Sequence, residues 1–118
     1  KHVRKVHEVS RKYDIWLPTF GHAADGNVHT HIMKVRFKDG NFIPVPEEEW
    51  REKSDKVREE LYQDCKSRGG MISGEHGIGI VKKHYLSYVL EEEQLQLMRG
   101  IKRLFDPHNI LNPNKIVD

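Results

Sequence analysis

The sequence has one cysteine, no long apolar run and almost no net charge. A single cysteine, Cys65, excludes an internal disulfide framework, so we expect a reducing, cytoplasmic location. No apolar run approaches the length that spans a membrane, and no signal peptide opens the chain. A targeting segment upstream of Lys1 stays open, since it would lie outside the given residues. The formal charge of +2 comes from interleaved basic and acidic residues, which gives no broad positive surface for nucleic acid or anionic lipid.

Apolar residues are also scarce, at 36% of the chain against 32% for charged residues. A core this lean makes a lone domain marginal, because small domains bury a smaller share of their surface. The spacing of apolar residues that is typical of a helix is present from the first residues of the chain. We therefore expect residues 1–118 to form a single domain that belongs to a longer protein.

Three helices follow from apolar residues spaced three or four apart. The predicted helices cover residues 1–13, 47–68 and 91–105. In the second, an acidic start complements the helix dipole and Gly69-Gly70 ends the helix. The predicted inner faces are Val3, Val6, Ser10 and Tyr13 in the first helix, Trp50, Ser54, Val57, Leu61 and Cys65 in the second, and Leu95, Met98, Ile101, Leu104 and Phe105 in the third.

Strands are predicted at 17–22, 28–37 and 71–73, the longest of them from imperfect alternation of apolar and polar residues. The order of elements resembles a ferredoxin-like plait from which the first strand is missing. The predicted class is therefore α+β, an antiparallel sheet with helices on one face. An unpaired sheet edge would favour self-association.

The stretch "GHAADGNVH" places two histidines around an Asp25-Gly26 turn. Asp-Gly is a strong hairpin signal, and a two-residue turn there sets His22 directly opposite His29. Paired side chains are about 5 Å apart at Cβ, so both rings reach one metal ion at about 2.1 Å. His31 points to the same side and would compete as a ligand. The alternative is a pair of surface histidines beside a tight turn.

The stretch "SGEHGIG" offers complementary chemistry. Glu75 is a natural third ligand, and three protein ligands leave a position open, as in catalytic metal sites. His76 is not needed as a ligand, and histidine suits a general base near neutral pH. The glycines would let the backbone approach a ligand closely. The alternative is an ordinary glycine-rich turn, and the spacing does not fit a dinucleotide-binding loop.

Three motifs in this order, "GHAADGNVH", "SGEHGIG" and "FDPHNILNPNKI", resemble the C-terminal domain of FAD-linked oxidases in the vanillyl-alcohol-oxidase-like superfamily. The resemblance is to the type that includes the flavin subunit of glycolate oxidase, D-lactate dehydrogenase and D-2-hydroxyglutarate dehydrogenase. One departure is Ala24, where this family usually has glycine. Because alanine tolerates a positive φ poorly, a slightly different turn is expected.

The resemblance implies a flavin-dependent dehydrogenase or oxidase of a small 2-hydroxy acid, with FAD bound mainly by an N-terminal domain outside this chain. It implies that His22, His29 and Glu75 bind a divalent metal, zinc or manganese, and that His76 is the catalytic base. It also implies that the tail around Asn112 and Lys115 packs towards the flavin. Without the hydride acceptor, the chain alone is expected to be inactive.

Two other interpretations remain open. One is a domain like that of alkylglycerone phosphate synthase, whose corresponding loop is histidine-rich where this chain has Glu75. The other is a non-catalytic, metal-stabilised interaction module with a closed site, to which His31 would add a fourth ligand. Lys82, Lys83 and His84 are expected in a solvated turn. Cys65 is expected in the core and not in the chemistry.

Overall fold

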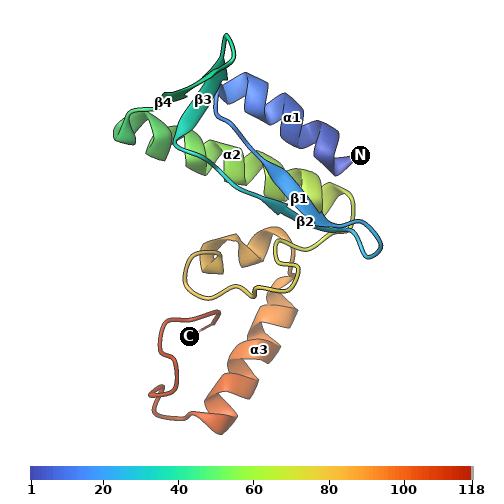
Figure 1. Cartoon of the computed structure of the whole chain (residues 1–118). Coiled ribbons are helices and arrows are strands. Elements are labelled where there is room, and N and C mark those ends of the chain that lie inside the picture. The colour runs from blue at the N-terminus through green and yellow to red at the C-terminus, as the bar shows by residue number, and fades with distance from the viewer. Residues whose placement is uncertain (118) are drawn as a thin grey trace. The chain divides into compact units, whose positions relative to one another are not determined.

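The computed structural model describes residues 1–117. The chain forms two compact units, Lys1–Arg68 and Gly69–Asp118. The first holds two helices and four short strands, and the second holds a 3-10 helix and one α-helix (Figure 1). The elements are α1 (His2–Tyr13), β1 (Thr19–His22), β2 (Asn27–Thr30), β3 (Val35–Lys38), β4 (Asn41–Pro44), α2 (Glu47–Ser67), η1 (Lys83–Tyr88) and α3 (Glu92–Phe105).

The core of the first unit lies where α1 and α2 pack against each other and against the segment that follows α1 (Figure 1). The predicted face of α2 is confirmed at Ser54, Val57 and Leu61, which are buried. In α1 the buried residues are Val6 and Val9, so the predicted inward position of Val3 is wrong. The buried cluster consists of Val6, Val9, Ile15, Leu17, Val57 and Leu61.

Local signals account for the bounds of α2, which agree with the prediction to within one residue. Three glutamates open the helix, where negative charge is favourable. Pairs four residues apart reinforce its first turns, with Arg51 Nε donating to Glu47 at 2.9 Å and Lys53 Nζ to Glu49 at 2.6 Å. Gly69, with φ at 71°, then takes the left-handed conformation that ends many helices.

The predicted strand over residues 28–37 is wrong, because two strands lie there in two different sheets. β2 pairs with β1 and β3 pairs with β4, both antiparallel. Between β2 and β3 the chain bonds to the segment before β1: His31 N–H donates to Pro18 O at 3.0 Å and Met33 N–H to Trp16 O at 3.2 Å, and Trp16 N–H donates to Val35 O at 2.9 Å. Pro18 has no N–H to return a bond to His31, so the ladder is incomplete at this pair.

The second unit differs more from the prediction. Residues 71–73 form no strand, and Lys83 and His84 belong to η1 instead of a solvated turn. The core consists of Leu86, Leu95 and Val117, with Ile78, Leu90 and Met98 packed against them.

The predicted inner side of α3 is only partly correct. Leu95 is buried and Met98 is half-buried, but Ile101, Leu104 and Phe105 are exposed. The face that these three share therefore lies outside the core of the second unit.

The predicted α+β class with antiparallel strands is confirmed. The strands form two separate two-stranded sheets and not one plait. Within residues 1–117, no helix combines the length and the apolar character needed to cross a membrane.

Candidate functional site

The β1–β2 hairpin carries the two histidines, but its register differs from the prediction. Gly26 N–H donates to His22 O at 3.1 Å, and Asn27 N–H donates to the Asp25 carboxylate at 3.1 Å. The turn is thus four residues long, and Gly26, with φ at 75°, supplies its left-handed position. His22 faces Asn27 and His29 faces Phe20. The predicted direct pairing of His22 with His29 is therefore wrong by two residues.

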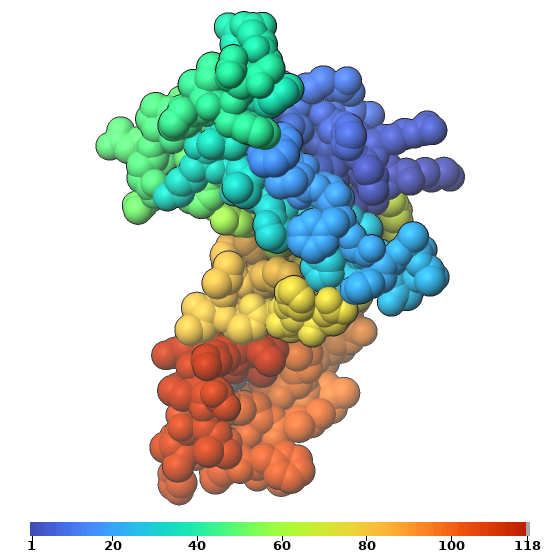
Figure 2. Space-filling model, in the orientation of Figure 1, coloured from blue at the N-terminus to red at the C-terminus, as the bar shows by residue number. Residues whose placement is uncertain are grey.

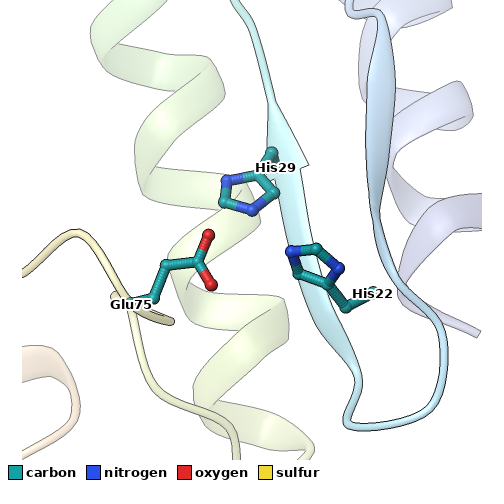
Figure 3. A group of neighbouring side chains, drawn as sticks. All are labelled: His22, His29 and Glu75. Atoms are coloured by element: carbon teal, nitrogen blue, oxygen red, sulfur yellow. The ribbon is translucent and has the colours of Figure 1, made fainter.

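The two imidazoles nevertheless meet on one face of the hairpin (Figure 3). A shift of one residue would have moved one ring to the opposite face, whereas a shift of two keeps both on the same face. His22 and His29 are diagonal neighbours, with ring centroids 6.0 Å apart and ring planes at 85°. A ring nitrogen of each lies within 4.8 Å of the other. His22 is exposed and His29 is half-buried, so the pair is accessible.

Gly21 allows the two strands to approach beside these histidines. A Cβ at this position would lie 2.1 Å from the backbone oxygen of Asn27 on the opposite strand. Real Cβ atoms do not come this close, so a side chain at Gly21 would push the strands apart. This requirement was not foreseen from the sequence, because it follows from the actual register. Ala24, the departure from the family pattern, is not among the residues with positive φ.

Phe20 is a further member of this face and was not among the residues predicted from the sequence. Its ring stacks on His29, with centroids 5.3 Å apart at 22°, and meets the edge of His31 at 5.2 Å. Phe20 is 57% exposed. An exposed aromatic ring against one imidazole of the pair restricts the orientation of that imidazole. His31, the predicted competing ligand, packs on Phe20.

The loop over residues 73–79 belongs to the second unit and presents Glu75 and His76, both exposed. His76 Nε2 lies 3.3 Å from Glu75 Oε1. Ser73 Oγ donates to Gly77 O at 2.9 Å and closes the loop. Gly77 and Gly79 have φ at 76° and 57°, with open space where a Cβ would stand. They serve the loop's conformation, and a close approach of the backbone to a ligand stays a prediction.

Lys82 follows this loop and was expected in a solvated turn. It is half-buried, and its Nζ donates to Ile72 O at 3.0 Å. Burial lowers the pKa of Lys82. This lysine ties the start of η1 to the residue before the loop, a role that no local pattern in the sequence indicates.

Cys65 was expected in the core, and it lies at the edge of the buried cluster instead of within it. It is half-buried on α2, and burial raises the pKa of its thiol, which disfavours the reactive thiolate. The cytoplasmic location inferred from the single cysteine stays a prediction.

The C-terminal tail carries Asn112 and Lys115, both exposed. Lys115 Nζ donates to the Asn112 side-chain oxygen at 3.4 Å. Ile116 has φ at 62°, a strained conformation for a β-branched residue. Its N–H donates to Gly79 O at 2.9 Å, so the strained residue joins the tail to the glycine-rich loop within the second unit.

Comparison with known proteins identifies the family of the chain that carries this hairpin and this loop. Residues 1–116 match the family described as FAD linked oxidases, C-terminal domain. The chain belongs to this family. A D-lactate dehydrogenase from Archaeoglobus fulgidus is 46% identical over 97% of the chain and 23% of its own length. The glycolate oxidase subunit GlcD of Bacillus subtilis is 38% identical over 97% of the chain and 22% of its own length.

A third relative, the D-2-hydroxyglutarate dehydrogenase of Xanthomonas citri pv. viticola, is 37% identical over 96% of the chain and 22% of its own length. This FAD-linked oxidase domain thus spans less than a quarter of these three relatives. Their names share a chemical feature: lactate, glycolate and 2-hydroxyglutarate each carry a hydroxyl group on the carbon next to a carboxylate.

Proposed function

We propose that the chain is the substrate- and metal-binding part of a flavin-dependent dehydrogenase or oxidase of a small 2-hydroxy acid. The observation that carries the proposal is the pair of imidazoles on one face of the β1–β2 hairpin, with ring nitrogens within 4.8 Å. The names of the three relatives support the substrate class. A domain like that of alkylglycerone phosphate synthase receives no support from these names.

His22, His29 and Glu75 are the residues that would hold a divalent cation. The fit rests on the donor set: two imidazoles with accessible nitrogens and a carboxylate suit zinc or manganese. Figure 3 draws the three side chains. Three protein ligands would leave room for the carboxylate and hydroxyl oxygens of the substrate.

When bound, the cation would polarise the substrate hydroxyl as a Lewis acid, and FAD, held mainly by a domain outside this chain, would accept the hydride from C2. His76 is the residue that takes the hydroxyl proton. Its ring is 71% exposed, so a substrate oxygen has access to it.

Asn112 and Lys115 are the candidates for contact with the flavin, because both are exposed, polar and held in a tail tied to the glycine-rich loop. The chain supplies a base and metal ligands and no hydride acceptor of its own. We therefore expect it to be inactive as a dehydrogenase when separated from the rest of the protein.

The metal proposal is tested by alanine substitution in the full-length protein. His22→Ala and His29→Ala should each reduce bound zinc or manganese, measured by metal analysis after dialysis, by about ten-fold or more. His31→Ala is the matched control, because His31 shares the hairpin face but packs on Phe20. Metal loss in His31→Ala equal to that in the other two would favour the closed four-ligand site of an interaction module. Unchanged metal content in all three variants would contradict the metal site.

A further inference from the structure

The first part of the glycine-rich loop, residues 73–77, carries Glu75 and His76 but no apolar side chain. We call these five residues the loop tip; Figure 2 shows this loop, in yellow, at the surface. The apolar anchors lie on either side of the tip: Ile72 is 4% exposed, and Ile78 packs against the core of the second unit. Glycines within the tip add conformational freedom. Hydrogen bonds must therefore hold the tip in one conformation.

Lys82 supplies one of these bonds. Its Nζ donates to Ile72 O at 3.0 Å, ten residues away in the sequence. The bond joins a residue before the tip to a residue after it, which is how the ends of a compact surface loop are held together. The acceptor end is fixed because Ile72 is buried. The donor end is held by the backbone, since Lys82 N–H donates to Ile78 O at 3.3 Å.

The surroundings of Lys82 show that this bond is what holds its amino group. Lys82 is half-buried, and burial lowers its pKa. Within residues 1–117, no carboxylate pairs with it. A cation that loses water costs free energy unless hydrogen bonds replace the water. The bond to Ile72 O offsets that cost, and no ion pair draws the side chain elsewhere.

Two further bonds hold other points of the same loop. Ser73 Oγ donates to Gly77 O at 2.9 Å and closes the tip on itself. Ile116 N–H donates to Gly79 O at 2.9 Å and holds the residues that follow the tip. Neither bond spans the tip from one side to the other. The bond from Lys82 does, so it controls the position of the tip as a whole.

We propose that Lys82 is a positioning residue for the loop tip, and that its bond to Ile72 O holds Glu75 and His76 in the geometry that metal binding and proton removal require. The inference rests on the roles proposed above for these two residues. Lys82 acts through the loop and not on the reacting atoms. A catalytic group displaced by about 1 Å loses on the order of 100-fold in rate. Loss of the bond should therefore weaken metal binding and slow flavin reduction together.

The test uses three variants of the full-length protein. Lys82→Met removes the donor and keeps an unbranched chain, whereas Lys82→Arg keeps a donor. Lys83→Met is the matched control: Lys83 is the next residue, is also half-buried, and lines a hollow with Leu95 and Arg99. The first readout is the rate at which a glutamate-specific protease cleaves after Glu75, followed by mass spectrometry on metal-free protein without substrate.

Cleavage should be faster in Lys82→Met than in wild type by about ten-fold, because the protease needs local opening and the opened tip no longer competes with a hydrogen bond from a charged donor. Lys82→Arg and Lys83→Met should stay within about two-fold of wild type, a change smaller than the loss of one hydrogen bond. Equal cleavage rates in Lys82→Met and Lys83→Met would overturn the proposal. This readout involves neither metal nor flavin, so it stands whatever the fate of the proposed function.

The second readout is anaerobic flavin reduction by a 2-hydroxy acid in a single turnover, with saturating zinc or manganese. In Lys82→Met the rate constant should fall by about ten-fold or more, with the amplitude kept, and Lys82→Arg should restore it. Loss of amplitude at an unchanged rate constant would indicate a merely unstable protein and would overturn the positioning role. So would faster cleavage with unchanged flavin reduction.

Failure of this inference and failure of the proposed function give different results. If the proposed function is wrong, Glu75→Gln and His76→Ala leave metal content and flavin reduction as in wild type. If only the positioning role is wrong, these two variants are impaired while Lys82→Met behaves like Lys83→Met.

Discussion

Gly21 shows how a single residue controls the geometry of the histidine pair. It lies next to His22, and the opposite strand leaves no room for a side chain there. A Cβ would stand 2.1 Å from the backbone oxygen of Asn27. Phe20 on its other side stacks on His29. The contact at Gly21 involves backbone and not a flexible side chain, so relief requires movement of a strand.

We predict that Gly21→Ala destabilises the hairpin by on the order of 1–3 kcal/mol, the usual cost of forcing extra atoms into a packed position. It should also weaken metal binding, because the strand that carries His22 must move. Gly40→Ala is the control: Gly40 also has a positive φ, at 80°, but has open space around it and lies in the other hairpin. Metal titration and thermal unfolding of both variants measure the effect. Metal affinity that falls equally in both would show that the close approach at Gly21 is not the cause.

At the scale of elements, α1 and α2 are joined at one end by a cluster of charged groups. His2 Nδ1 lies 2.7 Å from the Asp64 carboxylate. Arg68 donates to both carboxylate oxygens, at 2.8 and 2.7 Å. Arg68 and then His2 lower the pKa of Asp64 to about 2 despite partial burial. The charged carboxylate therefore stabilises the helix pair.

The pH dependence follows from this pKa. An Asp in the unfolded chain has a pKa of about 3.9, so the contribution of Asp64 is present above pH 4 and is lost as the pH falls towards 2. Asp64→Asn should lower the free energy of unfolding near pH 7 by roughly 1–2 kcal/mol, because Arg68 is partly exposed and screened. The difference from wild type should shrink towards zero near pH 2. Denaturant unfolding at several pH values measures it.

Asp55→Asn is the matched control for this prediction. Asp55 also pairs with an arginine, Arg58, but its side chain is 74% exposed. The stability change should stay within about 0.5 kcal/mol, as for most exposed pairs. A loss in Asp64→Asn that persists unchanged at pH 2 would contradict the electrostatic origin.

The elements also show which signals in the sequence are local. The helices could be predicted because their spacing, acidic starts and terminal glycines act over a few residues, as in α2. The strands could not, because the break at residues 31–34 depends on Pro18, which lies in another segment. The predicted register of the β1–β2 hairpin was wrong because the Asp-Gly pair alone does not specify the length of the turn. The Asp25 side chain and Gly26 build a turn of four residues.

At the scale of the whole molecule, the family and the identities of the candidate residues could be inferred from three ordered motifs, whereas positions that depend on a partner could not. The prediction that Ile101, Leu104 and Phe105 face inward was wrong for the second unit, because apolar periodicity marks an apolar face of a helix and does not say what packs against it. Phe20 and Lys82 were missed because their roles come from cross-strand and tertiary contacts.

In the proposed function two adjacent residues have different roles, Glu75 as a metal ligand and His76 as the base. Their side chains lie 3.3 Å apart, so a competing arrangement exists in which Glu75 only orients the imidazole. In that case Glu75→Gln would impair proton transfer and leave the metal in place. Metal content and turnover, measured together, distinguish the two.

The most direct measurement is metal analysis beside anaerobic flavin reduction by a 2-hydroxy acid, on full-length His76→Ala and Glu75→Gln. We expect His76→Ala to keep its metal while flavin reduction slows by about two to four orders of magnitude, the usual worth of a positioned base. Glu75→Gln should lose metal and activity together, because a neutral amide replaces a charged ligand poorly. Metal lost in His76→Ala and kept in Glu75→Gln would mean that the roles are reversed, and flavin reduction unchanged in both variants would contradict the account.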